Sequence, residues 1–144
     1  MTLRTHPNLQ IITYQNNIKN GWLLPIYNIH DSFITRLEAP EQVYLTAIDG
    51  YAIKGPHLHF KRRGLFTCVY GNIRIIARVN NKYEIYYSGD DHNYQTIEVP
   101  RGIPVALQNL ENKTALVLNM PCPAWTPEMN DQNKVEFDDF NFQL

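Results

Sequence analysis

The chain has 144 residues, of which 44% are hydrophobic and 19% charged, and its formal net charge is −1. That length supports one domain with one substantial core, so we expect a single domain over residues 1–144. A nearly neutral chain argues against bulk attraction to nucleic acid or anionic membranes, and no run approaches the roughly 20 apolar residues of a membrane span.

The N-terminal segment and the two cysteines bear on the cellular compartment of the protein and on the state of its thiols. Residues 1–10 lack the apolar core of a signal peptide, which predicts a cytoplasmic protein. Cys68 lies in an apolar run and Cys122 lies between two prolines, with no CxxC spacing. We therefore expect buried or inert thiols and no disulfide framework.

Short alternating runs rich in β-branched and aromatic residues recur along the chain, separated by clusters of Gly, Pro, Asn and Asp. They predict an all-β protein with strands, in chain order, at residues 10–14, 22–27, 41–48, 65–70, 72–79, 82–87, 94–99 and 114–120. Short strands at this spacing favour a sandwich or barrel such as a jelly roll. The segment from Pro121 onward has little periodicity, and we expect it to be a packed extension or cover.

Alternation predicts which strand faces are buried. In the run 72–79, one face is expected to carry Ile73, Ile75, Ala77 and Val79 into the core. Ile76 is an exception, because it falls on the other face. In the run 82–87, the same rule groups Tyr83 with Ile85 and Tyr87, for which core packing is the default.

The segment 55–64, GPHLHFKRRG, places two histidines and three cations between two glycines. Positions two apart on an extended chain point to the same side, so His57 and His59 aim at one place while Leu58 aims at the opposite face. Such a pair either delivers two imidazoles to one pocket or consists of surface histidines at the end of a strand. A short motif alone does not decide between these possibilities.

A metal site would need a third and usually a fourth ligand, commonly a carboxylate a few residues further on. After His59, the chain continues with Phe60, Lys61, Arg62 and Arg63. These side chains are neutral or cationic and would repel a divalent ion. The sequence therefore argues against a metal.

Proton transfer beside an anion is the alternative chemistry. A neutral imidazole accepts a proton near pH 7, and nearby cations stabilise a developing enolate. Four cations near the histidines could stabilise an enolate in this way or bind a diphosphate, namely Lys54, Lys61, Arg62 and Arg63. A solvated hairpin face would have the same composition, so the residues alone leave both interpretations open.

Two stretches of the chain, residues 41–79 and 97–131, resemble the cupin family of dTDP-4-dehydrorhamnose 3,5-epimerase and its shorter relatives. The family's N-terminal signature, a basic residue followed by Gly and a large aromatic residue, is similar to Lys19, Gly21 and Trp22. The resemblance runs from about residue 16 to residue 131. It implies a cupin jelly-roll barrel and a homodimer that exchanges N-terminal strands. It also implies a nucleotide-sugar substrate with a 4-keto-6-deoxy sugar, and neither metal nor organic cofactor.

The resemblance also implies roles for individual residues. The family's basic-Gly-x-His motif falls on Lys54, Gly55, Pro56 and His57, which makes His57 the expected base that removes a proton next to the ketone. Lys54 matches a basic residue that touches the substrate. Arg62 or Arg63 is expected to hold phosphate or enolate.

Two positions depart from the family pattern. The later strand of the epimerases carries a tyrosine acid, and the corresponding place here holds Asn119. Many short relatives carry a histidine where this chain has Val105. Both departures weaken the expectation of 3,5-epimerisation.

Two alternatives therefore stay open. The sugar 3,4-ketoisomerases have an RGxHxH pattern that resembles residues 54–59, and there His59 would be catalytic as well as His57. A cupin that only binds a nucleotide sugar is the second alternative. For Tyr44 and Trp125, core packing is the default and a place at the mouth of the pocket is the alternative. Tyr44 and Asn119 are counted among the substrate-binding residues. Asp138 and Asp139 are candidate carboxylate partners of His57, although the sequence does not place them beside it.

Overall fold

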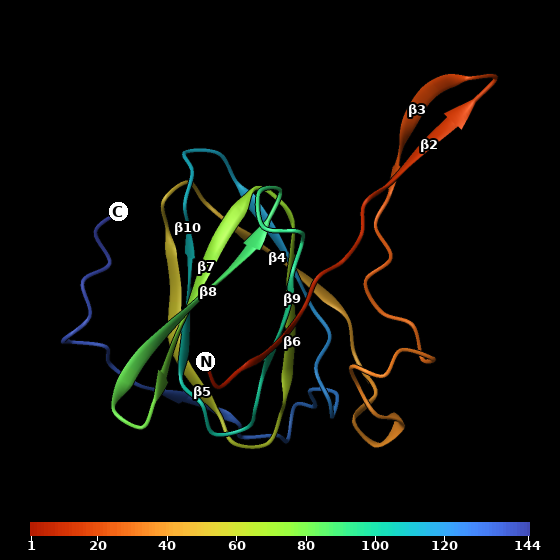
Figure 1. The fold of residues 1–144 in the computed structure, drawn as a ribbon. Helices are drawn as coiled ribbons and strands as arrows, with labels where there is room; N and C mark the ends of the chain where they lie inside the picture. Colours follow the sequence, from red (N-terminus) through yellow and green to blue (C-terminus); the bar gives the residue numbers. More distant parts are fainter.

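The computed structural model describes residues 1–144 and contains twelve strands and one short 3-10 helix (Figure 1). In chain order these are β1 (Arg4–His6), β2 (Ile11–Gln15), β3 (Ile18–Leu23), η1 (Arg36–Glu38), β4 (Tyr44–Ile48), β5 (Ile53–His59), β6 (Gly64–Tyr70), β7 (Asn72–Val79), β8 (Lys82–Gly89), β9 (Thr96–Val99), β10 (Val105–Asn109), β11 (Ala115–Asn119) and β12 (Gln132–Lys134).

The strands form two five-stranded antiparallel sheets, in the orders β1-β9-β6-β11-β4 and β12-β5-β10-β7-β8. We call them sheet 1 and sheet 2. Strands β2 and β3 form a separate hairpin that extends away from both sheets (Figure 1). The predicted all-β class is confirmed. Pairing links the strands into two sheets and does not itself close them into a barrel.

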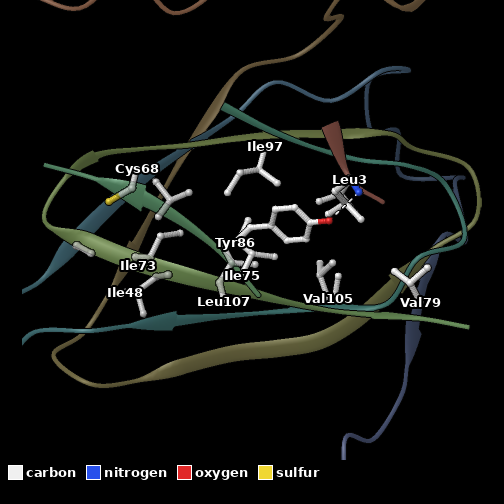
Figure 2. Packing of buried hydrophobic residues seen from close by; sticks show 14 residues of the cluster. Leu3, Ile48, Cys68, Ile73, Ile75, Val79, Tyr86, Ile97, Val105 and Leu107 are labelled. Atoms are coloured by element: carbon white, nitrogen blue, oxygen red, sulfur yellow. Dashed lines mark hydrogen bonds between the residues drawn. The ribbon is translucent and has the colours of Figure 1, made fainter. Parts of the chain in front are cut away.

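The main core lies between the two sheets and draws side chains from both (Figure 2). The predicted face of β7 is confirmed, because Ile73, Ile75, Ala77 and Val79 all belong to this core. Ile76 points the other way and is nevertheless fully buried, packing with Ala106 and Phe137 in a second cluster.

The segment that follows Pro121 covers the outer face of sheet 2. β12 pairs with β5, and Phe137, Phe140 and Phe142 pack over β7, β8 and β10. The prediction that this segment is a packed cover is confirmed. It also explains Ile76, which is an apolar residue on a face that alternation alone would assign to solvent.

The tyrosine of β8 that lies in the main core is not one of the two that alternation predicts. Tyr86 is the core residue, 4% exposed between the sheets, and its hydroxyl accepts a hydrogen bond from the main-chain N–H of Leu3 at 2.8 Å (Figure 2). Tyr83 packs under the C-terminal cover instead, while Tyr87 is 38% exposed. Because both faces of β8 are covered for much of its length, alternation does not show which face is the central core.

The hairpin also differs from the expected strand at 22–27, because β3 ends at Leu23 and residues 24–27 form no strand. Asn16 and Asn17 both have positive φ, 51° and 61°, as the two-residue turns of hairpins require. Several large apolar residues of the hairpin are exposed, including Ile11, Ile18 and Leu23.

Cys68 and Cys122 are free and buried, as predicted, and burial raises the pKa of Cys68 to about 12. No helix in the structure has the length and apolar character needed to cross a membrane.

Candidate active site

A cavity opens between the two sheets, and the predicted cationic motif lies in its wall. Sheet 2 contributes Lys54, His57 and His59 from β5, with Val105 and Leu107 beside them on the paired strand β10. Sheet 1 contributes the opposite wall, which includes Tyr44 and Thr46 from β4, Phe66 from β6 and Asn119 from β11. A bound molecule would therefore have histidines on one side and a phenol and an amide on the other.

A bulge in β5 brings Lys54 and His57 to the same wall. His57 pairs with Val105, and Lys54 pairs with Leu107, so three steps on β5 oppose two on β10. Gly55 makes the bulge with a φ of +94°, and a Cβ atom there would lie 3.0 Å from the carbonyl oxygen of Val105. Glycine is therefore required by both conformation and space.

His57 is placed to act as a base. It is partly buried, and burial lowers its pKa, with the positive charge of Lys54 lowering it further. The imidazole is therefore neutral at pH 7. Its ring centroid lies 6.5 Å from that of His59 with the planes at 74°, so both rings reach the same cavity without stacking.

His59 is held by a neighbouring arginine. Nη2 of Arg62 lies 3.1 Å from Nδ1 of His59, and a guanidinium has only donors, so Nδ1 accepts and the neutral ring carries its proton on Nε2. Burial lowers the pKa of His59, as does Arg62, while Asp131 opposes the shift. The distance from Oδ2 of Asp131 to Nδ1 of His59 is 3.4 Å. The same Oδ2 atom accepts the Nε–H of Arg62 at the shorter distance of 2.9 Å, so the carboxylate is paired with Arg62. We assign His59 as neutral for this reason.

Asp131 anchors the loop after β5 and was not anticipated from the sequence. It is 2% exposed, and its Oδ1 accepts the main-chain N–H of Lys61 at 2.6 Å. Burial alone would raise its pKa, but the hydrogen bonds from Arg62 and Lys61 outweigh burial and lower it. Asp138 and Asp139, the two candidate carboxylate partners of His57, lie elsewhere: neither lines the cavity, Asp138 is exposed, and Asp139 accepts a hydrogen bond from the hydroxyl of Tyr83.

The four predicted cations are placed differently from one another. Lys54, Arg62 and Arg63 line the cavity, whereas Lys61 is exposed and does not. Arg63 is only 3% exposed, and its guanidinium donates to the main-chain carbonyls of Glu38 and Met120. Its Nε is fully buried and has no hydrogen-bond partner. Arg63 therefore adds a buried cation, beside Arg62, to the wall of the cavity.

The remaining predicted residues lie as follows. Tyr44 and Asn119 line the cavity and are hydrogen-bonded to each other, with 2.7 Å between Oη and Nδ2. Val105 lines the sheet 2 wall. Trp125 is 50% exposed and is not part of the lining. No group of three or more His, Cys, Asp and Glu side chains is gathered as metal ligands would be.

No protein-family model and no curated protein sequence matches this chain. Solved structures do match in fold. A dTDP sugar isomerase from Desulfovibrio desulfuricans G20 aligns with a TM-score of 0.80 at 14% identity, covering 98% of this chain and 90% of that one.

Two further structures show the same fold with ligands. A sugar 3,4-ketoisomerase mutant from Thermoanaerobacterium thermosaccharolyticum in complex with TDP-4-keto-6-deoxyglucose aligns with a TM-score of 0.69 at 14% identity, covering 92% of this chain and 87% of that one. A dTDP-4-dehydrorhamnose 3,5-epimerase from Bacillus anthracis with TDP and PPi bound aligns with a TM-score of 0.74 at 13% identity, covering 95% and 80%. This chain therefore has the fold shared by these epimerases and ketoisomerases.

Proposed function

We propose that this protein is an isomerase that epimerises a nucleoside-diphosphate 4-keto-6-deoxy sugar by removing a proton from a carbon next to the ketone. The observation that carries the proposal is the neutral His57 in a cavity that the cations Lys54 and Arg63 also line. A base beside anion-stabilising donors is the arrangement that enolisation requires.

The proposed chemistry needs no metal and no organic cofactor. The C4 carbonyl acidifies the adjacent C–H bond, and His57 takes that proton. The C–H electron pair forms the enolate double bond, and the carbonyl electrons move to oxygen. Lys54 or Arg63 then stabilises the negative oxygen. Arg62 holds His59 directly, and it holds the loop after β5 through Asp131.

The solved structures of the same fold support the substrate class. Two of them hold TDP or a TDP-linked 4-keto-6-deoxy sugar. We carry over to this chain a nucleotide-sugar ligand, with the keto sugar between the sheets and the diphosphate toward the cationic side. Because Lys61 lies outside the cavity, we leave it out of the proposed site.

A sugar 3,4-ketoisomerase is the second candidate, and a specific observation favours it. Both imidazoles line one cavity, and His59 presents its proton on Nε2 because Nδ1 accepts from Arg62. In that reaction His57 removes the C3 proton, and His59 protonates the C4 oxygen to give an enediol. His59 then takes the proton of the C3 hydroxyl, His57 gives its proton to C4, and the product is a 3-keto sugar with no inversion at C5.

We further propose that residues 1–144 work as one domain and that two copies form a homodimer through the projecting hairpin of β2 and β3. The hairpin leaves Ile11, Tyr14 and Leu23 exposed at 43%, 64% and 59%. A hairpin with exposed apolar side chains is rarely stable alone in water. The partner that we propose for it is a second copy of this chain.

One-dimensional proton NMR of dTDP-4-keto-6-deoxyglucose in heavy water tests the reaction. We expect the C3 or C5 proton signal to fade with the wild-type protein and to persist with His57→Asn, whose fold is checked by circular dichroism. The control is His92→Asn, since His92 stacks on Tyr87 outside the cavity. A new 3-keto product would indicate the ketoisomerase, and ligand line broadening without exchange would indicate a protein that only binds the sugar.

A further inference from the structure

The hydrogen bond between Tyr44 and Asn119 has a defined direction. The Oδ1 atom of Asn119 accepts the buried main-chain N–H of Leu65 at 3.0 Å. Only an oxygen can accept that bond, so the orientation of the amide is fixed. The Nδ2 atom of Asn119 must then donate to the phenol oxygen of Tyr44, 2.7 Å away. Tyr44 accepts this bond and keeps its own proton for another partner.

The two residues form a cross-strand pair on sheet 1. Asn119 lies directly opposite Tyr44 in the pairing of β11 with β4, and both side chains line the cavity. His57 lines the same cavity from β5 of sheet 2. A sugar ring between the sheets would therefore meet the imidazole of His57 on one face and the phenol of Tyr44 on the other.

Inversion at carbon needs a proton donor on the face opposite to the base. On the sheet 1 wall, Phe66 and Asn119 have no suitable acidic proton, and the Thr46 hydroxyl is a far weaker acid than a phenol. Tyrosine is an established general acid. Tyr44 is also partly open, with 37% of its surface exposed, so a ligand can reach it.

We propose that Tyr44 is the catalytic acid of this protein, returning a proton to the enolate carbon on the face opposite His57. This rests on the proposed epimerase function. The enolate double bond supplies the electron pair for the new C–H bond, the Tyr44 O–H bond breaks, and the carbonyl reforms. The phenolate remains hydrogen-bonded to Asn119 until solvent returns its proton, while His57 releases its proton to solvent.

Asn119 is then a positioning residue that acts through Tyr44. The family resemblance implies a tyrosine acid at position 119, and the structure supplies a phenol from the neighbouring strand β4 at the same wall. This accounts for an otherwise missing acid without assigning the carboxamide any proton transfer of its own.

The test separates exchange from inversion, again with dTDP-4-keto-6-deoxyglucose in heavy water. With Tyr44→Phe, His57 still removes the proton and returns deuterium on the same face. We expect exchange within about tenfold of wild type, but epimer formation reduced by roughly 100-fold or more, which is the usual contribution of a general acid. Tyr51→Phe, an exposed tyrosine outside the cavity, is the control.

A second variant tests the direction of the hydrogen bond. Asn119→Asp keeps an acceptor for the Leu65 N–H but replaces the donor that faces Tyr44 with an acceptor oxygen. Tyr44 must then donate its proton to the new carboxylate. We expect the same loss of epimer formation with exchange retained, and thymidine diphosphate binding within a few-fold of wild type. A purely structural role for the pair would lower exchange and inversion together.

The outcomes distinguish the two proposals. Unchanged epimer formation in Tyr44→Phe, with exchange in the wild type, overturns the role of Tyr44 and leaves the proposed function standing. Parallel loss of exchange and inversion also overturns that role. Absence of exchange in the wild type overturns the proposed function and the role of Tyr44 with it.

Discussion

Lys54 and His57 lie three positions apart on β5 and yet line the same cavity, because β5 bulges between them against β10. The consequence is electrostatic. Burial is the first cause of the lowered pKa of His57, and the positive charge of Lys54 is the second. By bringing Lys54 to the same wall, the bulge therefore lowers the pKa of His57 as well as positioning its side chain.

Removing that charge should move the pH dependence of the reaction. His57 must be neutral to act, so kcat/KM should fall on acidification through a pKa below the ordinary 6.5. In Lys54→Gln the imidazolium is less destabilised, its pKa rises, and the acidic limb should move to higher pH. The pH profile of proton exchange measures this shift. An acidic limb that stays in place would show that Lys54 does not set the pKa of His57.

Lys61→Gln is the matched control for Lys54→Gln. It removes the same charge from the same segment, but Lys61 is exposed and lies outside the cavity. We expect its pH profile to coincide with that of the wild type. A limb that moves equally in both variants would instead point to the general charge of the protein.

The buried ion pair of Arg62 and Asp131 should be important for stability. Their side chains are 11% and 1% exposed. Asp131→Asn leaves the Arg62 guanidinium without its countercharge, and breaking such a pair typically costs about 3–5 kcal/mol. Urea unfolding measures the loss. Glu38→Gln is the control, because Glu38 and Arg101 are 42% and 37% exposed and such pairs contribute about 1 kcal/mol or less.

The same pair gives a pH test with a defined sign. The pKa of Asp131 is lower in the folded protein than its ordinary 3.8, so its ionised form is favoured by folding. Its contribution is complete above the unfolded pKa and is lost as the pH falls through the folded pKa. The difference in unfolding free energy between the wild type and Asp131→Asn should therefore shrink below about pH 4. A constant difference across that range would contradict this assignment.

Local patterns in the sequence predicted most of the strands, among them β7 and β8, and the shared direction of the histidine pair. The alternation of β7 and the shared direction of His57 and His59 depend on period two alone. β10 was missed because Val105 to Asn109 are all buried, which removes the alternation. The contact of Asp131 with Arg62 joins residues 69 positions apart. No local pattern encodes such a contact, nor the pairing of Tyr44 with Asn119.

The C-terminal cover should stabilise the fold through Phe137. This residue is 5% exposed and packs with Ile76 and Ala106 on the outer face of sheet 2. Phe137→Ala removes a buried ring, which typically costs about 3–5 kcal/mol. Thermal or urea unfolding measures the change. Phe60→Ala, at a ring that is 58% exposed, should change stability far less, and equal losses would show that Phe137 has no special part in the packing.

The projecting hairpin should decide the number of subunits. Ile11 and Leu23 are paired across β2 and β3, and both are exposed in the single chain. Charges at both positions, as Ile11→Glu with Leu23→Glu, would be costly to bury against a second copy. Light scattering after size exclusion should give two chains for the wild type and one for the double variant. Leu37→Glu, at a residue 94% exposed on η1, is the control and should leave the dimer intact. A wild type that elutes as one chain, or a double variant that stays dimeric, would refute assembly through this hairpin.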